Sequence, residues 1–106
     1  MAVLTPTTVR ALLADHDLVP KRALGQHFLA DPNTARRIAR LAELEPGASV
    51  LEIGPGLGSL TVALAETGAR VVALELDAQL VPLVESTVAG TGDVTVVHGD
   101  ALDVDV

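Results

Sequence analysis

SVLEIGPGLG, residues 49–58, is the stretch that decides the fold of this 106-residue chain. Its first five residues form a short β-type run, and glycines follow directly. Glycine lets the backbone turn sharply and lets a ligand approach without a Cβ in the way. Leu60 to Glu66 then has a helical pattern. The stretch therefore predicts a strand, a glycine loop and a helix whose first N–H groups face that loop.

The residues after the loop repeat this alternation of strand and helix. Residues 70–75, RVVALE, predict a second strand, and residues 94–98, VTVVH, predict a third. Asp77 can cap a helix that runs to about Val88, with Pro82 kinking it or delaying its start. The order β-α-β-α-β with mostly apolar strands is typical of an α/β fold with a parallel sheet, right-handed crossovers and helices on both faces.

Two helices are predicted ahead of the first of these strands. Thr5-Pro6 and Asp31-Pro32 each place a capping residue before a proline at the first helical position. The first pair predicts a helix over about residues 6–15, and the second predicts a helix that closes at Pro46-Gly47. Residues 17–30 have no clean hydrophobic period, so we expect an ordered loop between the two helices.

The composition excludes several classes of protein. The chain is 49% hydrophobic, enough for a core, and it has no cysteine, which excludes disulfides, thiolate metal sites and cysteine nucleophiles. His16 and His98 have no partners at metal-ligand spacing, so we expect no metal. The chain has no apolar run of about 18 residues, which a membrane-spanning helix needs, and no basic segment followed by an apolar one, as in a secretory signal peptide. We therefore expect a cytoplasmic protein that does not contact a membrane.

The charge is uneven along the chain. The net charge of −7 and a single aromatic residue, Phe28, argue against a stand-alone nucleic-acid binder. Residues 1–40, however, hold six basic and three acidic side chains, whereas residues 41–106 hold one basic and eleven acidic side chains. The basic part is either a segment that faces a polyanion or a solvated helix face.

Three carboxylates lie at the carboxyl ends of the three predicted strands. Glu75 lies 21 residues after Gly54, where an acid can accept from both hydroxyls of a ribose. Glu52 would repel a pyrophosphate and suits a positively charged ligand, and Ser59 stands where a dinucleotide fingerprint has its third glycine. Asp100 is placed to accept from an adenine amine. The alternative for Glu52 and Asp100 is that they only cap helices or turns.

Four stretches of the chain resemble the rRNA adenine dimethyltransferase family. They are KRALGQHFL at 21–29, EIGPGLG at 52–58, ELD at 75–77 and GDA at 99–101. The erythromycin-resistance methylases share much of this pattern, and the first stretch is closer to the housekeeping enzyme that dimethylates two adjacent adenosines of small-subunit rRNA. The resemblance implies a Rossmann-like class I methyltransferase fold, S-adenosyl-L-methionine as cofactor, and small-subunit rRNA or the pre-ribosomal small subunit as partner.

The resemblance also implies roles for individual residues. His27 and Leu29 would close over the methyl donor, Gly54 would line it, Glu75 would hold its ribose and Asp100 its adenine. Without the motif, His27 would be read as a helix-cap or core histidine. The other residues assigned to the donor are Gln26, Glu52, Gly56 and Gly58, and those assigned to the RNA are Lys21 and Arg22.

The resemblance further implies how the chain is divided. Residues 1–30 would form an N-terminal helix and a loop that closes over the donor and faces RNA, and residues 31–106 the first half of the methyltransferase domain. The family's Asn-Leu-Pro-Tyr/Phe segment, which is expected to hold the amine of the adenosine that is methylated, is not in these 106 residues. The family's helical C-terminal domain is not in them either. We therefore expect no catalytic residue within the chain and no activity from the chain alone.

Two other functions stay open at this point: the nucleotide-binding module of an NAD-dependent oxidoreductase, and a non-catalytic fragment. The methyltransferase topology also makes a structural prediction. Its first strand lies between the second and the fourth, and the three predicted strands do not include a fourth. We therefore expect Val50 to Ile53 to present an unpaired apolar edge, and the domain to be marginally stable.

Overall fold

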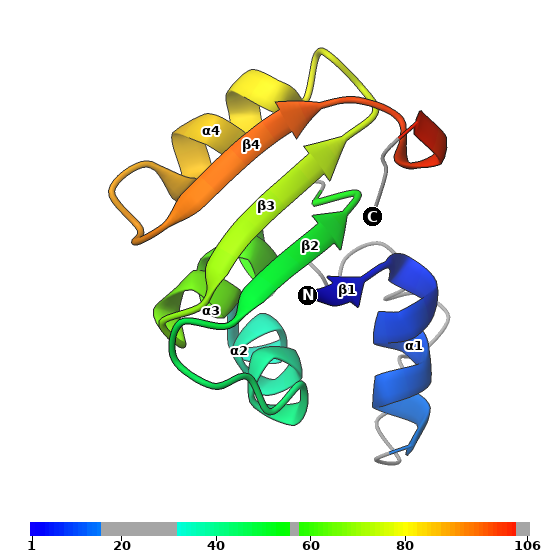
Figure 1. Cartoon of the computed structure of the whole chain (residues 1–106), viewed down its shortest axis with the longest axis vertical. Helices are drawn as coiled ribbons and strands as arrows, with labels where there is room; N and C mark the ends of the chain where they lie inside the picture. The colour runs from blue at the N-terminus through cyan, green and yellow to red at the C-terminus, as the bar shows by residue number, and fades with distance from the viewer. Residues whose placement is uncertain (16–31, 56–57, 104–106) are drawn as a thin grey trace.

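The computed structural model describes residues 1–15, 32–55 and 58–103, apart from the side chains of Leu12, Leu13, Asp15 and Pro32. Four parallel strands form one sheet in the order β1-β2-β3-β4 (Figure 1). In chain order the elements are β1 (Ala2–Leu4), α1 (Pro6–Asp15), α2 (Pro32–Leu41), β2 (Ser49–Ile53), α3 (Ser59–Glu66), β3 (Arg70–Glu75), α4 (Val81–Val88), β4 (Val94–His98) and the short 3-10 helix η3 (Ala101–Asp103).

The three predicted strands are confirmed at their predicted bounds, and they pair in parallel. Val50 of β2 lies opposite Val71 of β3, and Glu75 of β3 lies opposite His98 of β4. The first helix also begins where its proline predicts, because the Thr5 hydroxyl accepts from the Thr8 N–H at 3.1 Å and caps α1. Strands β2, β3 and β4 and the start of α1 therefore follow from local sequence signals.

The start of α4 differs from the prediction. Asp77 does not cap the helix: its Oδ1 accepts from the Gln79 N–H at 2.9 Å and its carbonyl from the Leu80 N–H at 3.0 Å, which closes a turn. The helix begins only at Val81, with Pro82 in its first turn. Proline is tolerated there because its missing N–H has no partner in the first turn of a helix. Pro82 thus delays the start of the helix.

The predicted open edge of β2 is wrong. Residues 2–4, to which the sequence reasoning assigned no element, form β1 and pair in parallel with β2, with Val3 opposite Leu51 and Leu4 opposite Glu52. Leu4 also packs against the core. A strand of three residues is too short to show a hydrophobic period, so nothing local marked it. The edge is closed by a strand that lies more than forty residues earlier in the chain.

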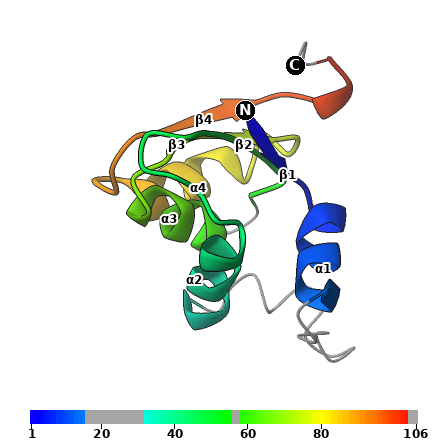
Figure 2. The same ribbon diagram turned by 60° about the horizontal axis from the view of Figure 1, so that its bottom comes forward.

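The prediction of helices on both faces is also wrong for the described residues. Helices α1 to α4 all lie on one face of the sheet (Figure 2). The physical reason is that each strand lies next to the one before it in the chain, always on the same side, so the sheet grows from β1 to β4 in one direction. Successive right-handed crossovers in one direction place their helices on the same face of the sheet. The core under these helices contains Val9, Ala35, Ile38, Ala39, Val50, Leu60, Ala63, Leu64, Ala65, Ala69 and Val71.

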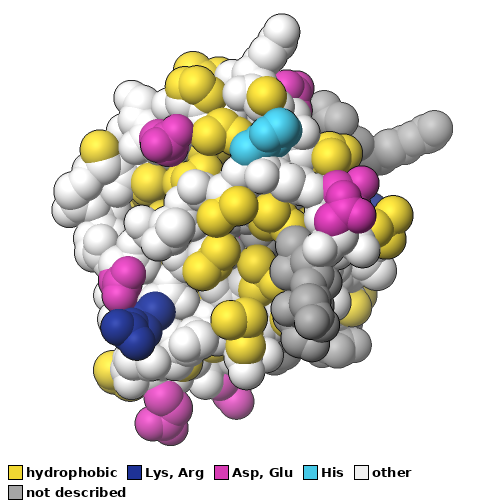
Figure 3. Space-filling view, turned by 45° about the horizontal axis from the view of Figure 1, so that its top comes forward, with side chains coloured by type: hydrophobic (Ala, Val, Ile, Leu, Met, Phe, Trp, Pro, Cys, Tyr) yellow, Lys and Arg dark blue, Asp and Glu magenta, His cyan; other side chains and the backbone are white. Residues whose placement is uncertain are grey.

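Hydrophobic side chains gather across the view of Figure 3, which looks onto the side of the molecule away from the helices. Val3 of β1 and Val97 of β4 alternate with helix-facing residues of their strands and are 38% and 39% exposed. None of the helices within the described ranges is long and apolar enough to cross a bilayer.

Candidate functional site

The carboxyl ends of β2, β3 and β4 lie side by side and bring the three predicted acids to one edge of the sheet. Hydrogen bonds continue the pairing beyond the strands: the Gly54 N–H donates to the Leu74 carbonyl at 2.9 Å, and the Gly99 N–H donates to the Glu75 carbonyl at 3.0 Å. Crevices outside this edge are where open α/β sheets bind ligands.

The glycine loop turns the chain from β2 into α3. Gly58 has a φ of +88° and is the N-cap residue of α3, and its N–H donates to the Pro55 carbonyl at 2.9 Å. A Cβ on Gly58 would lie 3.3 Å from Cγ2 of Thr87, so this glycine is required by its backbone angle and by packing against α4. Gly54 has a φ of +74°, and among the described residues a Cβ there would contact Pro6, at 3.9 Å. Of these two predicted glycines, Gly54 is therefore the one with open space beside it.

Glu52 is almost completely buried, with 4% of its surface exposed. Its Oε1 accepts a hydrogen bond from the hydroxyl of Thr61 on α3. Burial raises the pKa of the Glu52 carboxyl from 4.5 to about 7; the Thr61 hydrogen bond opposes this rise, and the nearby Glu75 carboxylate adds to it. Among the described residues, the partner that the structure gives Glu52 is the side chain of Thr61.

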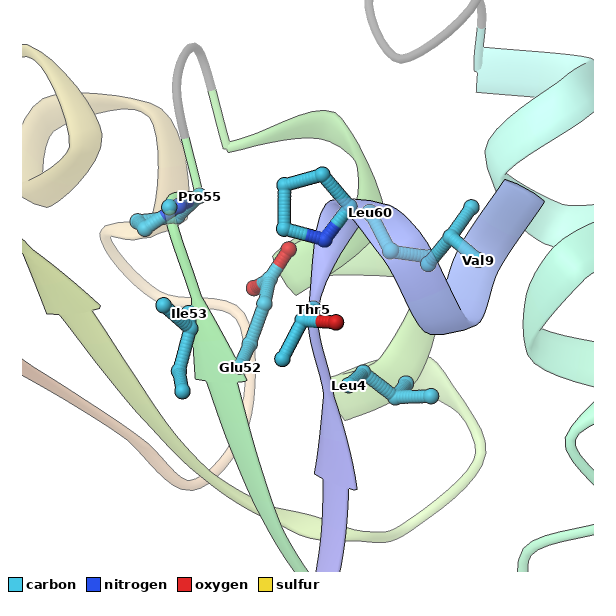
Figure 4. A pocket seen from close by; sticks show the side chains of 9 residues that line it. Leu4, Thr5, Val9, Glu52, Ile53, Pro55 and Leu60 are labelled. Carbon is cyan, nitrogen blue, oxygen red and sulfur yellow. The ribbon is translucent and has the colours of Figure 1, made fainter. Parts of the chain in front are cut away.

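The N-terminal segment forms a wall of the Glu52 site that sequence reasoning missed. Figure 4 shows Glu52 on β2 facing the start of α1. The cavity between them is small, about 10 Å³, and it opens to solvent. The only sequence signal in this segment was the Thr5-Pro6 helix start, which says nothing about its position in the sheet. The residues around the space are Leu4, Thr5, Pro6, Val9, Glu52, Ile53, Gly54, Pro55 and Leu60.

The other two acids are both engaged with backbone groups. Glu75 is 6% exposed, and its Oε2 accepts from the Asp77 N–H at 2.9 Å. Asp100 is half-buried, and its Oδ1 accepts from the Leu102 N–H at 2.9 Å, so the turn-cap alternative holds for that oxygen. His98, the last residue of β4, is exposed, with Nε2 3.0 Å from the Leu76 carbonyl oxygen, as expected of a surface residue.

Several predicted site residues have no described position, so their roles stay predictions. The structure brings together Glu52, Gly54, Gly58, Glu75 and Asp100. Those outside the described residues are Lys21, Arg22, Gln26, His27, Leu29 and Gly56. Besides the residues of the N-terminal segment, Thr61 is a site residue that the sequence reasoning did not name. Its only sequence signal was a hydroxyl close behind the glycine loop.

Comparison with known proteins gives a consistent family match. The family model described as ribosomal RNA adenine dimethylase matches residues 19–106. A ribosomal RNA small subunit methyltransferase A from Deinococcus radiodurans is 55% identical over 101 residues, which are 95% of this chain and 34% of that protein. The chain thus spans about a third of the length of this curated relative.

Solved structures agree with the fold. The chain is similar to the 23S rRNA methyltransferase ErmE, with a TM-score of 0.65 and 38% identity, over 72% of this chain and 31% of that one. It is also similar to a dimethyladenosine transferase from Plasmodium falciparum, with a TM-score of 0.62 and 29% identity, over 72% of this chain and 28% of that one. The predicted Rossmann-like methyltransferase fold is therefore confirmed.

Proposed function

Because this chain belongs to the ribosomal RNA adenine dimethylase family, we propose that it is the donor-binding part of an enzyme that methylates N6 of two adjacent adenosines in small-subunit rRNA, with S-adenosylmethionine as donor. The observation that carries the proposal is the buried Glu52 carboxylate at the end of β2, beside the glycine loop. The name of the curated relative supports the small-subunit RNA as the target.

The residues of this edge fit S-adenosylmethionine better than a dinucleotide. The cofactor supplies an activated methyl group and has an ammonium and a sulfonium charge. A carboxylate held beside the loop attracts such charges, whereas it repels a pyrophosphate. Ser59 opens α3 where a dinucleotide fingerprint would have glycine. These features disfavour the NAD-dependent oxidoreductase alternative.

Each predicted residue then has a distinct task. Glu52 pairs with the cationic end of the donor, and Gly54 lets the donor approach the backbone. Glu75 accepts from the ribose hydroxyls, and Asp100 accepts from the adenine amine. The residues that we propose to complete the donor site are Gln26, His27, Leu29, Gly56 and Gly58, and those that we propose to face the RNA are Lys21 and Arg22.

The division of the chain follows from these tasks. We propose that residues 1–30 cover the donor and face the RNA, and that residues 31–106 form the first half of the methyltransferase domain. The chain binds and orients the donor, and its sequence does not contain the Asn-Leu-Pro-Tyr/Phe segment that is expected to hold the amine of the substrate adenosine. We therefore expect donor binding but no adenosine methylation from these 106 residues.

Calorimetric titration with S-adenosylhomocysteine and with NAD tests the proposed function. We expect heat of binding with S-adenosylhomocysteine and none with NAD. Heat from NAD alone would overturn the proposal. Absence of heat from both ligands, with the fold intact, would favour the non-catalytic fragment.

Replacing Glu75 by alanine should weaken binding of S-adenosylhomocysteine by about 1–3 kcal/mol, because a charged acceptor is removed from two hydroxyls. Calorimetry on the variant and the native chain measures the difference. The matched control is Glu85→Ala, which removes an exposed carboxylate from α4 and should leave affinity unchanged. Equal affinities for all three proteins would remove Glu75 from the site.

Replacing Asp100 by alanine should have a smaller effect, confined to the adenine end of the donor. We expect affinity for S-adenosylhomocysteine to fall by about tenfold or less, the value of one hydrogen bond. Affinity for an analogue without the exocyclic amine should hardly change. Because Asp100 also caps a turn, circular dichroism must show the fold retained. Equal losses for the two ligands would contradict the adenine contact.

A further inference from the structure

Thr61 is a fully buried hydroxyl on the third residue of α3, with 0% of its surface exposed. Helical threonines often donate to a carbonyl of their own helix, as Thr87 does in α4 to the Leu83 carbonyl at 2.9 Å. Thr61 instead donates across to Oε1 of Glu52 on β2. The bond links the first turn of α3 to the strand end that precedes the glycine loop.

We propose that Thr61 is a positioning residue for the methyl-donor site: its hydroxyl holds the Glu52 carboxylate in one orientation, so that Glu52 can pair with the cationic end of the donor. This inference rests on the proposed function. Thr61 itself touches no reacting atom.

The surroundings of Glu52 explain why the carboxylate needs this help. Burial favours its neutral form, and the Glu75 carboxylate on β3 acts in the same direction. The other described residues around the space are Leu4, Thr5, Pro6, Val9, Ile53, Gly54, Pro55 and Leu60, and none of them is titratable. Among the described residues, Thr61 is thus the neighbour whose hydrogen bond favours the charged carboxylate. A neutral Glu52 would have no charge to offer a cationic ligand.

The test uses the full chain and four variants. Thr61→Val keeps the shape and removes the hydroxyl, Thr61→Ser keeps the hydroxyl, and Thr61→Ala is a second variant without it, should valine disturb the fold. The control is Thr67→Val, which removes a hydroxyl that donates to the Leu64 carbonyl at the other end of α3. Two measurements are made: the carbon NMR titration of the Glu52 carboxyl without ligand, and S-adenosylmethionine affinity by calorimetry between pH 6 and 9.

We expect Thr61→Val to move the titration of Glu52 to higher pH and to weaken S-adenosylmethionine binding about tenfold or more at pH 7, as for loss of a hydrogen bond to a charged group. The loss should shrink as pH rises, because Glu52 then ionises without help. Thr61→Ser should behave as the native chain. Thr67→Val should leave both the titration and the affinity unchanged.

Two outcomes would overturn the inference. One is an unchanged Glu52 titration in both Thr61→Val and Thr61→Ala. The other is an equal, pH-independent loss of affinity in Thr61→Val and Thr67→Val, which would mean that Thr61 has only a structural role. A native chain that binds no S-adenosylmethionine while Thr61→Val still shifts the titration would overturn the proposed function and retain the Thr61–Glu52 coupling.

Discussion

Glu52→Gln should raise the free energy of unfolding at pH 8 by about 3 kcal/mol. The carboxyl has a pKa of about 7 in the folded chain against an ordinary value of 4.5, and each unit of difference corresponds to about 1.4 kcal/mol. At pH 8 the native chain must hold a buried charge that the unfolded chain holds in water. Glutamine keeps the size of the side chain and an oxygen that accepts from Thr61, and it removes the charge.

The sign of the pH dependence follows from the raised pKa. A carboxyl that binds its proton more tightly in the folded state stabilises the fold fully below about pH 4.5. This contribution declines as the pH rises and is lost above about pH 7. Urea unfolding at pH 5, 6, 7 and 8 measures it. The native chain should lose stability over this range, and Glu52→Gln should lose much less.

An exposed acid provides the control for this experiment. Glu85→Gln removes a carboxylate from the surface of α4 and should keep the native pH dependence. If Glu52→Gln and Glu85→Gln show the same slope of stability against pH, then Glu52 is not the titrating group. On the proposed function, Glu52→Gln should also weaken S-adenosylmethionine binding at pH 8. Greater stability together with weaker binding is the pattern expected of a residue kept for function.

Deleting residues 1–4 should produce the second large effect. The deletion removes β1, which pairs with β2 through Ala2, Val3 and Leu4, and it removes the packing of Leu4 against the core. We expect the free energy of unfolding to fall by about 2–4 kcal/mol, the size of a lost leucine contact plus a few backbone hydrogen bonds. The exposed edge of β2 should also pair with other chains.

Urea unfolding and sedimentation velocity at several concentrations measure the two consequences of the deletion. The control is Val3→Thr, which keeps a β-branched residue at a position that is 38% exposed and should change neither stability nor association. The deleted chain should sediment as larger species as its concentration rises, at concentrations where the full chain does not. Identical sedimentation of the two chains would show that β1 does not protect the edge of β2.

Most of the fold could be predicted because its signals are local. The strands at residues 49–53, 70–75 and 94–98 consist mainly of apolar residues bounded by turn residues, and each was predicted at its observed bounds. The glycines after β2 announced the loop and the helix that follows. Parallel pairing then placed Glu52, Glu75 and Asp100, each in or just beyond the last residues of a strand, at one edge. The alternation of strands and helices was enough to predict parallel pairing of these strands, because the right-handedness of crossovers leaves few possible topologies.

The sequence by itself therefore determined the order of strands and helices from α1 to β4, the glycine loop, and which acids stand at the carboxyl edge of the sheet. Only the tertiary structure decided that residues 2–4 pair with β2, that the described helices share one face, and that Glu52 is buried beneath the N-terminal segment against Thr61. The physical reason is distance along the chain. A helix or strand reflects the preference of its own residues, whereas the pairing of β1 and the raised pKa of Glu52 arise from contacts between distant segments, which no local pattern contains.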